Sequence, residues 1–266
     1  MPAVTHQLVS VMDKPDSSMA DIATVIQYDP VITASILKTC NSAFYGAKTP
    51  VESIKDAVNR LGVDKVVELA LTTSGSKILS GRQAGYGLEE GEMWQYSVSS
   101  AVVAKDIAKK LGLKNRNTIF TAALLKDIGK VILEKYVKKE AQAISGLVGK
   151  KEFSFQEAEK KVLGIDHAEL GAMIAKFWNF SPKMIKLIRH HHLSDEKKIQ
   201  DKEVACVYLA DCICMMVGIG VGADGLAYRF RETVMNGLKI SASDITLIIA
   251  ELGMKMQEIE EMLQMS

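Results

Sequence analysis

Carboxylate and imidazole side chains occur at four places inside otherwise apolar stretches of this 266-residue chain. Asp127 is flanked by apolar runs on both sides, and His167 begins a segment that ends in an aromatic pair. His190–His192 form an uninterrupted run, and Asp211 lies in a further apolar stretch. A polar side chain in such a position costs free energy unless it is paired. These residues are therefore the first candidates for a functional site.

The chemistry that these residue types could carry is the binding of a divalent cation. Two imidazoles and two carboxylates from separate helices are a sensible ligand set in a helical bundle. The sequence offers a weak metal site made of Asp127, His167, His191 and Asp211, with His192 as an alternative to His191. A satisfied network of buried polar groups explains the same residues without a metal. For His190, a helix end that favours a cation is the simpler explanation.

The elements that position these residues are predicted to be helices. The chain has only 19 Gly and 5 Pro, and its apolar residues recur at helical spacing, which favours an all-α fold over a many-turned sheet. We expect helices over residues 21–26, 30–39, 54–61, 64–79, 93–110, 117–138, 154–163, 166–179, 182–191, 202–217, 227–238 and 243–265. The predicted architecture is a two-lobed helical bundle.

A glycine-rich stretch at residues 80–91 has no helical period and marks the predicted boundary between two lobes. We place the boundary near residue 88, which gives an N-terminal helical lobe over residues 1–88 and a second helical lobe over residues 89–266. The candidate site residues all belong to the second lobe.

Composition excludes several classes of function. The 33 Lys and Arg against 32 Asp and Glu give a net charge of +1, so no global field attracts nucleic acid or anionic lipid. No uncharged stretch reaches the ~20 residues that span a bilayer, and no secretory signal is visible. The four cysteines form no C-x-x-C pair, which is typical of reduced thiols. We therefore expect a cytoplasmic protein with no membrane segment and no nucleic-acid partner.

Two other motifs have simpler explanations. Gly218, Gly220 and Gly222 suggest a nucleotide loop, but the fingerprint needs a further Gly at the position of Ala223 and a preceding strand. A loop between helices is the better interpretation. Residues 53–71 could form a helix-turn-helix, but its second helix carries two acids and a single base, which suits packing better than DNA phosphates.

Short motifs along the chain, taken together, resemble one known family. In the first lobe they are Asp29-Pro30, the run from Cys40 to Gly46, and Ser53 to Val58 with Leu61-Gly62. In the second lobe they are Trp94 to Ser97, Leu124 to Lys130, His167 to Gly171, Phe177-Trp178, His191-His192 and Ala210-Asp211. In this order they resemble the HDOD family, the HD-related output domain of bacterial signalling proteins. HDOD is a branch of the HD superfamily of metal-dependent phosphohydrolases, and the resemblance implies an HD-like helical fold.

Departures from the catalytic members of the superfamily matter for activity. Those enzymes carry His where this chain has Tyr96 and Lys126, so the resemblance implies that two imidazole ligands are lost. A protonated Lys cannot ligate a cation, and its ammonium near Asp127 and Asp211 would take over the electrostatic role of a metal. Lys130 resembles a lysine that contacts substrate phosphate in cyclic-dinucleotide-cleaving relatives, but it is equally an ordinary i,i+3 neighbour of Asp127.

The sequence thus predicts a degenerate HD-like module that is not a working enzyme. Its residual pocket would contain Tyr96, Lys126, Asp127, Lys130, His167, His191, His192 and Asp211. We expect the module to act in signal transduction by binding a signalling protein partner or a small ligand, with at most a residual divalent metal as cofactor. The alternative is a phosphohydrolase acting on a nucleotide or cyclic dinucleotide with an altered ligand set.

Overall fold

The computed structural model describes residues 3–12, 18–27, 30–41, 51–149, 153–193, 199–223, 225 and 231–264. Within these ranges the regular elements are helices and no strand forms, which confirms the all-α prediction. The chain divides into two compact units, Met1–Ile78 with Glu251–Ser266, and Leu79–Ala250. None of the described helices is long and apolar enough to cross a lipid bilayer.

The first unit is built from short amphipathic helices: α1 (Ala3–Met12), α2 (Met19–Gln27), α3 (Pro30–Cys40), α4 (Ile54–Leu61) and most of α5 (Val63–Leu79). Helix α2 packs on α3 and α4, and the predicted apolar positions Ile22, Ile26, Ile54 and Val58 are buried there. Ser53 caps α4 by accepting a hydrogen bond from the Asp56 backbone N–H. Of the HDOD-like motifs, Asp29 and residues 42–46 lie outside the described residues.

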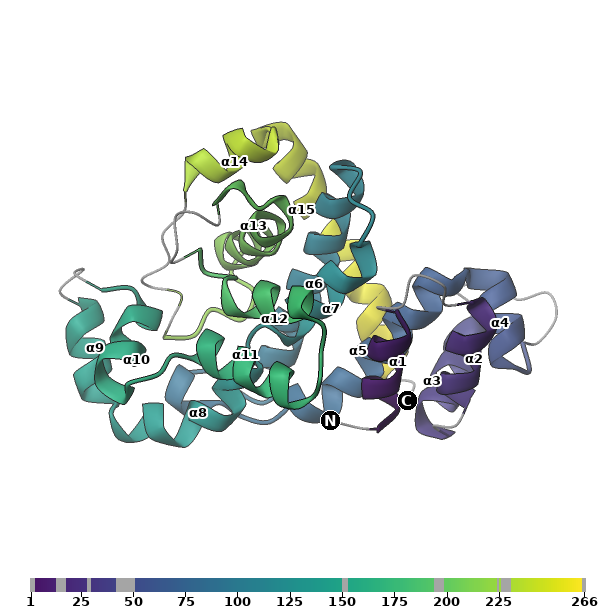
Figure 1. Cartoon of the computed structure of the whole chain (residues 1–266), viewed down its shortest axis with the longest axis horizontal. Coiled ribbons are helices and arrows are strands. Elements are labelled where there is room, and N and C mark those ends of the chain that lie inside the picture. Colours follow the sequence, from purple (N-terminus) through teal and green to yellow (C-terminus); the bar gives the residue numbers. More distant parts are fainter. Residues whose placement is uncertain are drawn as a thin grey trace. The chain divides into compact units, whose positions relative to one another are not determined.

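The second unit is centred on α6 (Glu92–Lys110), α7 (Arg116–Leu125), α12 (Pro182–Arg189) and α13 (Lys202–Met216), which pack on one another (Figure 1). Helix α13 is buried on all sides from Val204 to Cys214. A helix buried all round has no polar face to give to solvent, so its one acidic residue in this stretch, Asp211, must find partners inside the protein.

Four further helices complete the part of this unit that holds the site: α8 (Ile128–Lys139), α9 (Ala141–Gly149), α10 (Phe155–Leu163) and α11 (His167–Phe177). Helices α8, α9 and α10 pack against one another, and α11 packs on both α8 and α12. Helix α14 (Glu232–Leu238) packs on α13, and α15 (Ala242–Gln264) follows it.

The structure divides the predicted helix over residues 117–138 into α7 and α8. Lys126 and Asp127 form the joint between them, and Asp127 leaves helical geometry with φ −95° and ψ 9°. Periodicity could not reveal this break, because the apolar residues on both sides remain at helical spacing. The break matters because it turns two adjacent charged side chains into the interior.

The glycine-rich stretch predicted to mark the boundary between the lobes belongs to the second unit. A short 3-10 helix, η2 (Ala84–Tyr86), packs on α8, and the Tyr86 side chain is fully buried. The described contacts thus divide the chain at Leu79, before this stretch, whereas the sequence placed the boundary near residue 88. The division into lobes over residues 1–88 and 89–266 stays a prediction.

Close packing of α8 on α11 requires glycine at position 129. A Cβ at Gly129 would lie 2.1 Å from the backbone oxygen of His167, so Gly129→Ala should lower the free energy of unfolding by ~1–3 kcal/mol through overpacking. In α9, a Cβ at Gly146 would meet nothing within 4 Å, so Gly146→Ala should raise it by ~0.5–1 kcal/mol. Chemical denaturation of both variants measures the difference, and equal effects would contradict this packing.

Candidate functional site

An ammonium group bridges two carboxylates in the interior of the second unit. Lys126 Nζ contacts Oδ2 of Asp127 and lies 2.7 Å from Oδ1 of Asp211. Lys130 Nζ lies 2.9 Å from Oδ1 of Asp127. The Tyr96 hydroxyl donates a hydrogen bond to Oδ1 of Asp211, and its ring centroid lies 4.1 Å from Lys126 Nζ. We call these five residues the ion-pair cluster.

Complete burial makes the ion-pair cluster depend on its internal pairing. The side chains of Lys126, Asp127, Lys130 and Asp211 are each at most 2% exposed. Burial by itself would raise the pKa of Asp127, but the ammonium groups of Lys126 and Lys130 outweigh it and hold that pKa well below its usual range. Burial would likewise lower the pKa of Lys126, but the charges of Asp127 and Asp211 raise it. The charges of Asp127 and Lys126 are thus maintained by their neighbours, whereas burial outweighs Lys126 at Asp211 and raises the pKa of that carboxyl.

Three helices, α6, α8 and α13, position most of the ion-pair cluster. Asp127 begins α8 as its N-cap residue, yet its side chain makes no capping hydrogen bond and is used for the two lysines instead. Asp211 comes from α13 and Tyr96 from α6, two helices that pack directly on each other. Lys130, one turn into α8, is the i,i+3 partner of Asp127. Its second predicted role, as a phosphate contact, stays a prediction.

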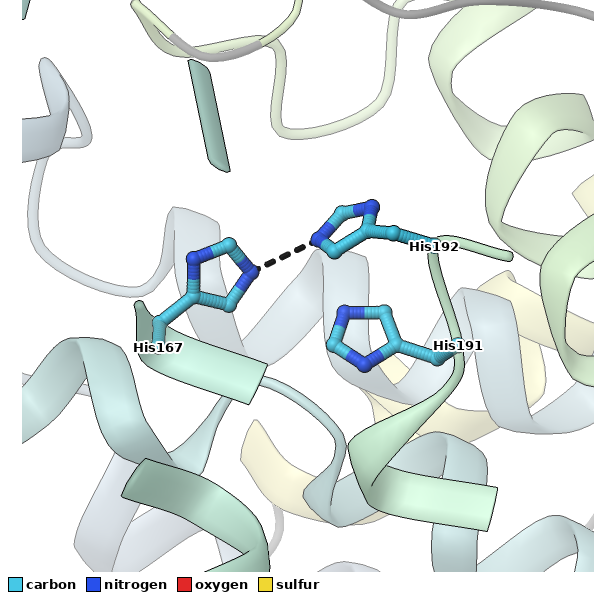
Figure 2. A group of neighbouring side chains, drawn as sticks. All are labelled: His167, His191 and His192. Carbon is cyan, nitrogen blue, oxygen red and sulfur yellow. Dashed lines mark hydrogen bonds between the residues drawn. The ribbon is translucent and has the colours of Figure 1, made fainter. Parts of the chain in front are cut away.

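Three imidazoles form a second group beside Asp127, the histidine cluster of His167, His191 and His192 (Figure 2). Their potential ligand atoms all lie within 4.8 Å of one another. Nε2 of His167 lies 2.7 Å from Nε2 of His192, and the dashed line in Figure 2 marks this contact. His190, in contrast, ends α12 and is not part of the group, as the sequence led us to expect.

Asp127 connects the two clusters through its second oxygen. Oδ1 lies 3.6 Å from Nε2 of His167 and 3.8 Å from Nε2 of His191. Among the described residues, neither this oxygen nor Nε2 of His191 has a hydrogen-bond partner. Two buried acceptors that face each other without a hydrogen between them favour a cation, which here would share Oδ1 with the Lys130 ammonium 2.9 Å away.

The hydrogen positions on the imidazoles agree with a cation site. Nδ1 of His191 lies 2.8 Å from the Ile188 carbonyl oxygen and must donate to it, which leaves a lone pair on Nε2. Burial lowers the pKa values of His191 and His192 well below the usual range, so both rings are neutral. His167 differs, because burial opposes its protonation but the carboxylate of Glu159 outweighs this and raises its pKa. A bound cation would replace the hydrogen that His167 shares with His192.

The chemistry of the donor set fits one divalent transition metal. Neutral imidazoles together with a carboxylate oxygen are the ligands that Zn²⁺ and Fe²⁺ commonly take. Of the four residues predicted as ligands, the structure brings Asp127, His167 and His191 together and adds His192. Asp211 lies instead on the far side of Lys126, where Tyr96 and the ammonium occupy its Oδ1. A metal does not fit between Asp127 and Asp211, since the buried ammonium groups of Lys126 and Lys130 already balance the two carboxylates.

Two residues that the sequence reasoning missed lie behind His167. Glu159 is completely buried in α10, with Oε2 2.5 Å from Nδ1 of His167, and the Tyr86 hydroxyl donates a hydrogen bond to its Oε1. The sequence did contain a signal for Glu159, because this acid lies at the spacing of one helix face together with apolar residues. These residues are Phe155, Ala158 and Val162. An acid on an otherwise apolar face is a marker of the same kind as Asp127.

The glycine-rich segment after α13 lies directly on the tyrosines of the site. A Cβ at Gly220 would lie 2.5 Å from Cβ of Tyr96, and one at Gly222 would lie 2.2 Å from the Tyr86 backbone oxygen. That oxygen also accepts a hydrogen bond of 2.7 Å from the Ala223 N–H. The structure therefore has a loop here that follows a helix, as predicted, and its glycines allow close contact with Tyr96 and Tyr86.

Comparison with known proteins decides the family. The sequence model of the HDOD domain matches residues 1–194, which is most of the chain. The chain belongs to the HDOD family. The predicted relationship to HDOD proteins is thus confirmed, and the HDOD match contains Tyr96, the Lys126–Lys130 segment and all three histidines of the cluster, whereas Asp211 lies beyond it.

Solved structures of an HDOD domain protein and of a candidate phosphohydrolase share the fold. An HDOD domain protein of unknown function from Geobacter sulfurreducens is 28% identical, with a TM-score of 0.72 over 97% of this chain and 90% of that chain. A candidate phosphohydrolase from Shewanella amazonensis SB2B is 23% identical, with a TM-score of 0.68 over 100% of this chain and 94% of that chain. An uncharacterised protein from Treponema pallidum (strain Nichols) is 23% identical over 72% of this HDOD chain. The chain spans only 37% of the length of that relative.

The ion-pair cluster makes a direct prediction about stability. Replacing Lys126 by Met leaves Asp127 and Asp211 buried without their shared partner, which should lower the free energy of unfolding by ~3–5 kcal/mol. The matched control is Lys139→Met, at an exposed position on α8, where we expect a change within about 0.5 kcal/mol. Chemical denaturation measures both variants.

A double variant separates charge pairing from lost packing. Adding Asp211→Asn to Lys126→Met removes one of the two stranded charges and keeps an acceptor for the Tyr96 hydroxyl. The double variant should therefore be less destabilised than the sum of the single variants. Simple additivity, or equal stabilities of the Lys126 and Lys139 variants, would show that the ammonium does not hold the cluster together.

Proposed function

We propose that this chain is a non-catalytic regulatory HDOD module that acts in signal transduction by binding a protein partner or a small ligand. The observation that carries this proposal is the position of Lys126 Nζ, in contact with both Asp127 and Asp211. In the catalytic enzymes that the sequence resembles, these carboxylates serve a metal centre. Here an internal ammonium is their counter-ion.

The loss of two imidazoles supports the same conclusion. Two-metal hydrolysis needs enough neutral donors to hold two ions at a short separation, so that one activates water and the other stabilises the leaving oxygen. Tyr96 and Lys126 stand at two of the ligand positions, and both donate hydrogens to Asp211 rather than a lone pair to a metal. Without those two ligands the chain keeps the fold and loses the metal pair.

We expect no hydrolysis of cyclic dinucleotides or of generic phosphodiesters by the purified protein with added Mg²⁺, Mn²⁺ or Fe²⁺. The physical reason is that Lys126 excludes a second cation from Asp127 and Asp211 by charge repulsion. Product formation is followed by chromatography, with Asp127→Ala as the control for a contaminating enzyme. Metal-dependent turnover that disappears in Asp127→Ala would refute the non-catalytic proposal.

The histidine cluster favours a second candidate function, a metal-dependent phosphohydrolase with an altered ligand set. His167, His191, His192 and Asp127 would hold one divalent ion, which would polarise a phosphate oxygen and lower the pKa of a bound water. The Shewanella structure named as a candidate phosphohydrolase shares the fold. This candidate and the non-catalytic module differ in turnover, so the hydrolysis assay separates them.

Substitutions of two adjacent histidines test whether the histidine cluster binds a metal. The protein should bind about one Zn²⁺ per chain, and His191→Gln should weaken binding at least ~10-fold because it removes an inward-facing lone pair. His190→Gln is the matched control, one residue away and outside the histidine cluster, and should bind as the unaltered protein does. Calorimetry and elemental analysis measure both. Equal losses in the two variants would place any bound ion elsewhere.

A further inference from the structure

Three buried side chains from separate elements form a continuous chain of hydrogen bonds behind the histidine cluster. Tyr86 lies in η2, Glu159 in α10, and His167 at the start of α11. The Tyr86 hydroxyl donates to Oε1 of Glu159, and Oε2 of Glu159 lies 2.5 Å from Nδ1 of His167. All three side chains are at most 1% exposed.

Both carboxylate oxygens of Glu159 are fully used, which fixes its orientation. Oε1 accepts from Tyr86, and Oε2 accepts from the ring Nδ1–H and also from the backbone N–H of His167 at 3.2 Å. A carboxylate held at both ends can accept hydrogen bonds only, so Nδ1 of His167 keeps its hydrogen. Nε2 then faces His192 and Asp127, at 2.7 Å and 3.6 Å.

A structural role alone does not explain an acid at this position. Phe155 and Ala158, on the same face of α10, are buried apolar residues, and an apolar side chain at position 159 would avoid the cost of burying a carboxylate. Metal-ligating histidines commonly donate their other ring N–H to a carboxylate, which fixes the tautomer and the ring orientation. Glu159 and His167 have this arrangement.

We propose that Glu159 is the positioning residue of the histidine cluster, anchored by Tyr86, and that it keeps Nε2 of His167 free of a fixed hydrogen for a divalent cation. This inference rests on the cation site described above. Glu159 would touch neither the cation nor a substrate, and it acts only through His167.

The experiment compares Glu159→Gln, which keeps an acceptor for Nδ1, with Glu159→Met, which removes it. Long-range ¹H–¹⁵N spectra of the metal-free full chain, recorded where the imidazoles are neutral, report which nitrogen of His167 carries the hydrogen. Calorimetry with Zn²⁺ alone reports affinity. Glu90→Met, the same kind of change at an exposed side chain, is the control.

We expect the hydrogen on Nδ1 in the unaltered protein and in Glu159→Gln, and on Nε2 in Glu159→Met. Zn²⁺ affinity should fall ~10–100-fold in Glu159→Met, should fall less in Glu159→Gln, and should not change in Glu90→Met. If Glu159 had only a structural role, Glu159→Met would not move the hydrogen of His167 from Nδ1 to Nε2. The Gln and Met variants would then not differ in tautomer. An unchanged tautomer and affinity in Glu159→Met would overturn the proposal.

Two further outcomes, absence of Zn²⁺ binding and failure of Glu159→Met to fold, also test the proposal. If the unaltered protein binds no Zn²⁺, the cation site is refuted, while the tautomer comparison still tests the positioning of His167 by Glu159. If Glu159→Met does not fold, the spectrum of the unaltered protein decides. A neutral His167 with its hydrogen on Nε2 would overturn the proposal, and a hydrogen on Nδ1 that Glu159→Gln retains would support it.

Discussion

The contact of one ammonium group with two buried carboxylates constrains much of the second unit. Lys126 and Asp127 can enter the interior only because the helix that would have run through them is broken into α7 and α8. The start of α8 can approach α11 only because residue 129 has no side chain. Asp211 is tolerated on a helix buried on all sides because Lys126 and Tyr96 reach it. Removing charged groups from water is costly unless each gains a partner, so these local features depend on one another.

The sequence predicted the class of the fold and most of the chemistry-bearing residues. Polar residues in apolar helices pointed to Asp127, His167 and Asp211, and the resemblance to HDOD proteins added Tyr96 and Lys130. These signals work because a buried polar group is rare in a helix and is therefore visible in the pattern of residue types. The structure brings all of these residues into one region of the second unit.

The sequence placed the Lys126 ammonium near Asp127 and Asp211, but it could not decide whether Asp211 pairs with that ammonium or joins the metal ligands. The choice depends on whether an oxygen of Asp211 lies nearer to an ammonium or to an imidazole, which side-chain geometry decides and residue spacing does not. The break at Lys126 was missed for a related reason, since apolar periodicity is the same before and after it. Glu159 was overlooked because its neighbours Glu157 and Lys160 make the segment read as an ordinary charged helix.

Asp127 has two oxygens, and one of them faces both clusters. Oδ2 contacts Lys126, while Oδ1 faces Lys130 and the histidines. A cation at Oδ1 would share that oxygen with the ammonium of Lys130, so its binding beside the histidines would affect ion pairing in the interior. If the cation weakens this pairing, a change that weakens the pairing must favour the cation in return, because coupling between two equilibria is reciprocal. Lys126 also pairs with Asp211 of α13, so a cation beside the histidines would change the charge balance that α13 faces without touching that helix.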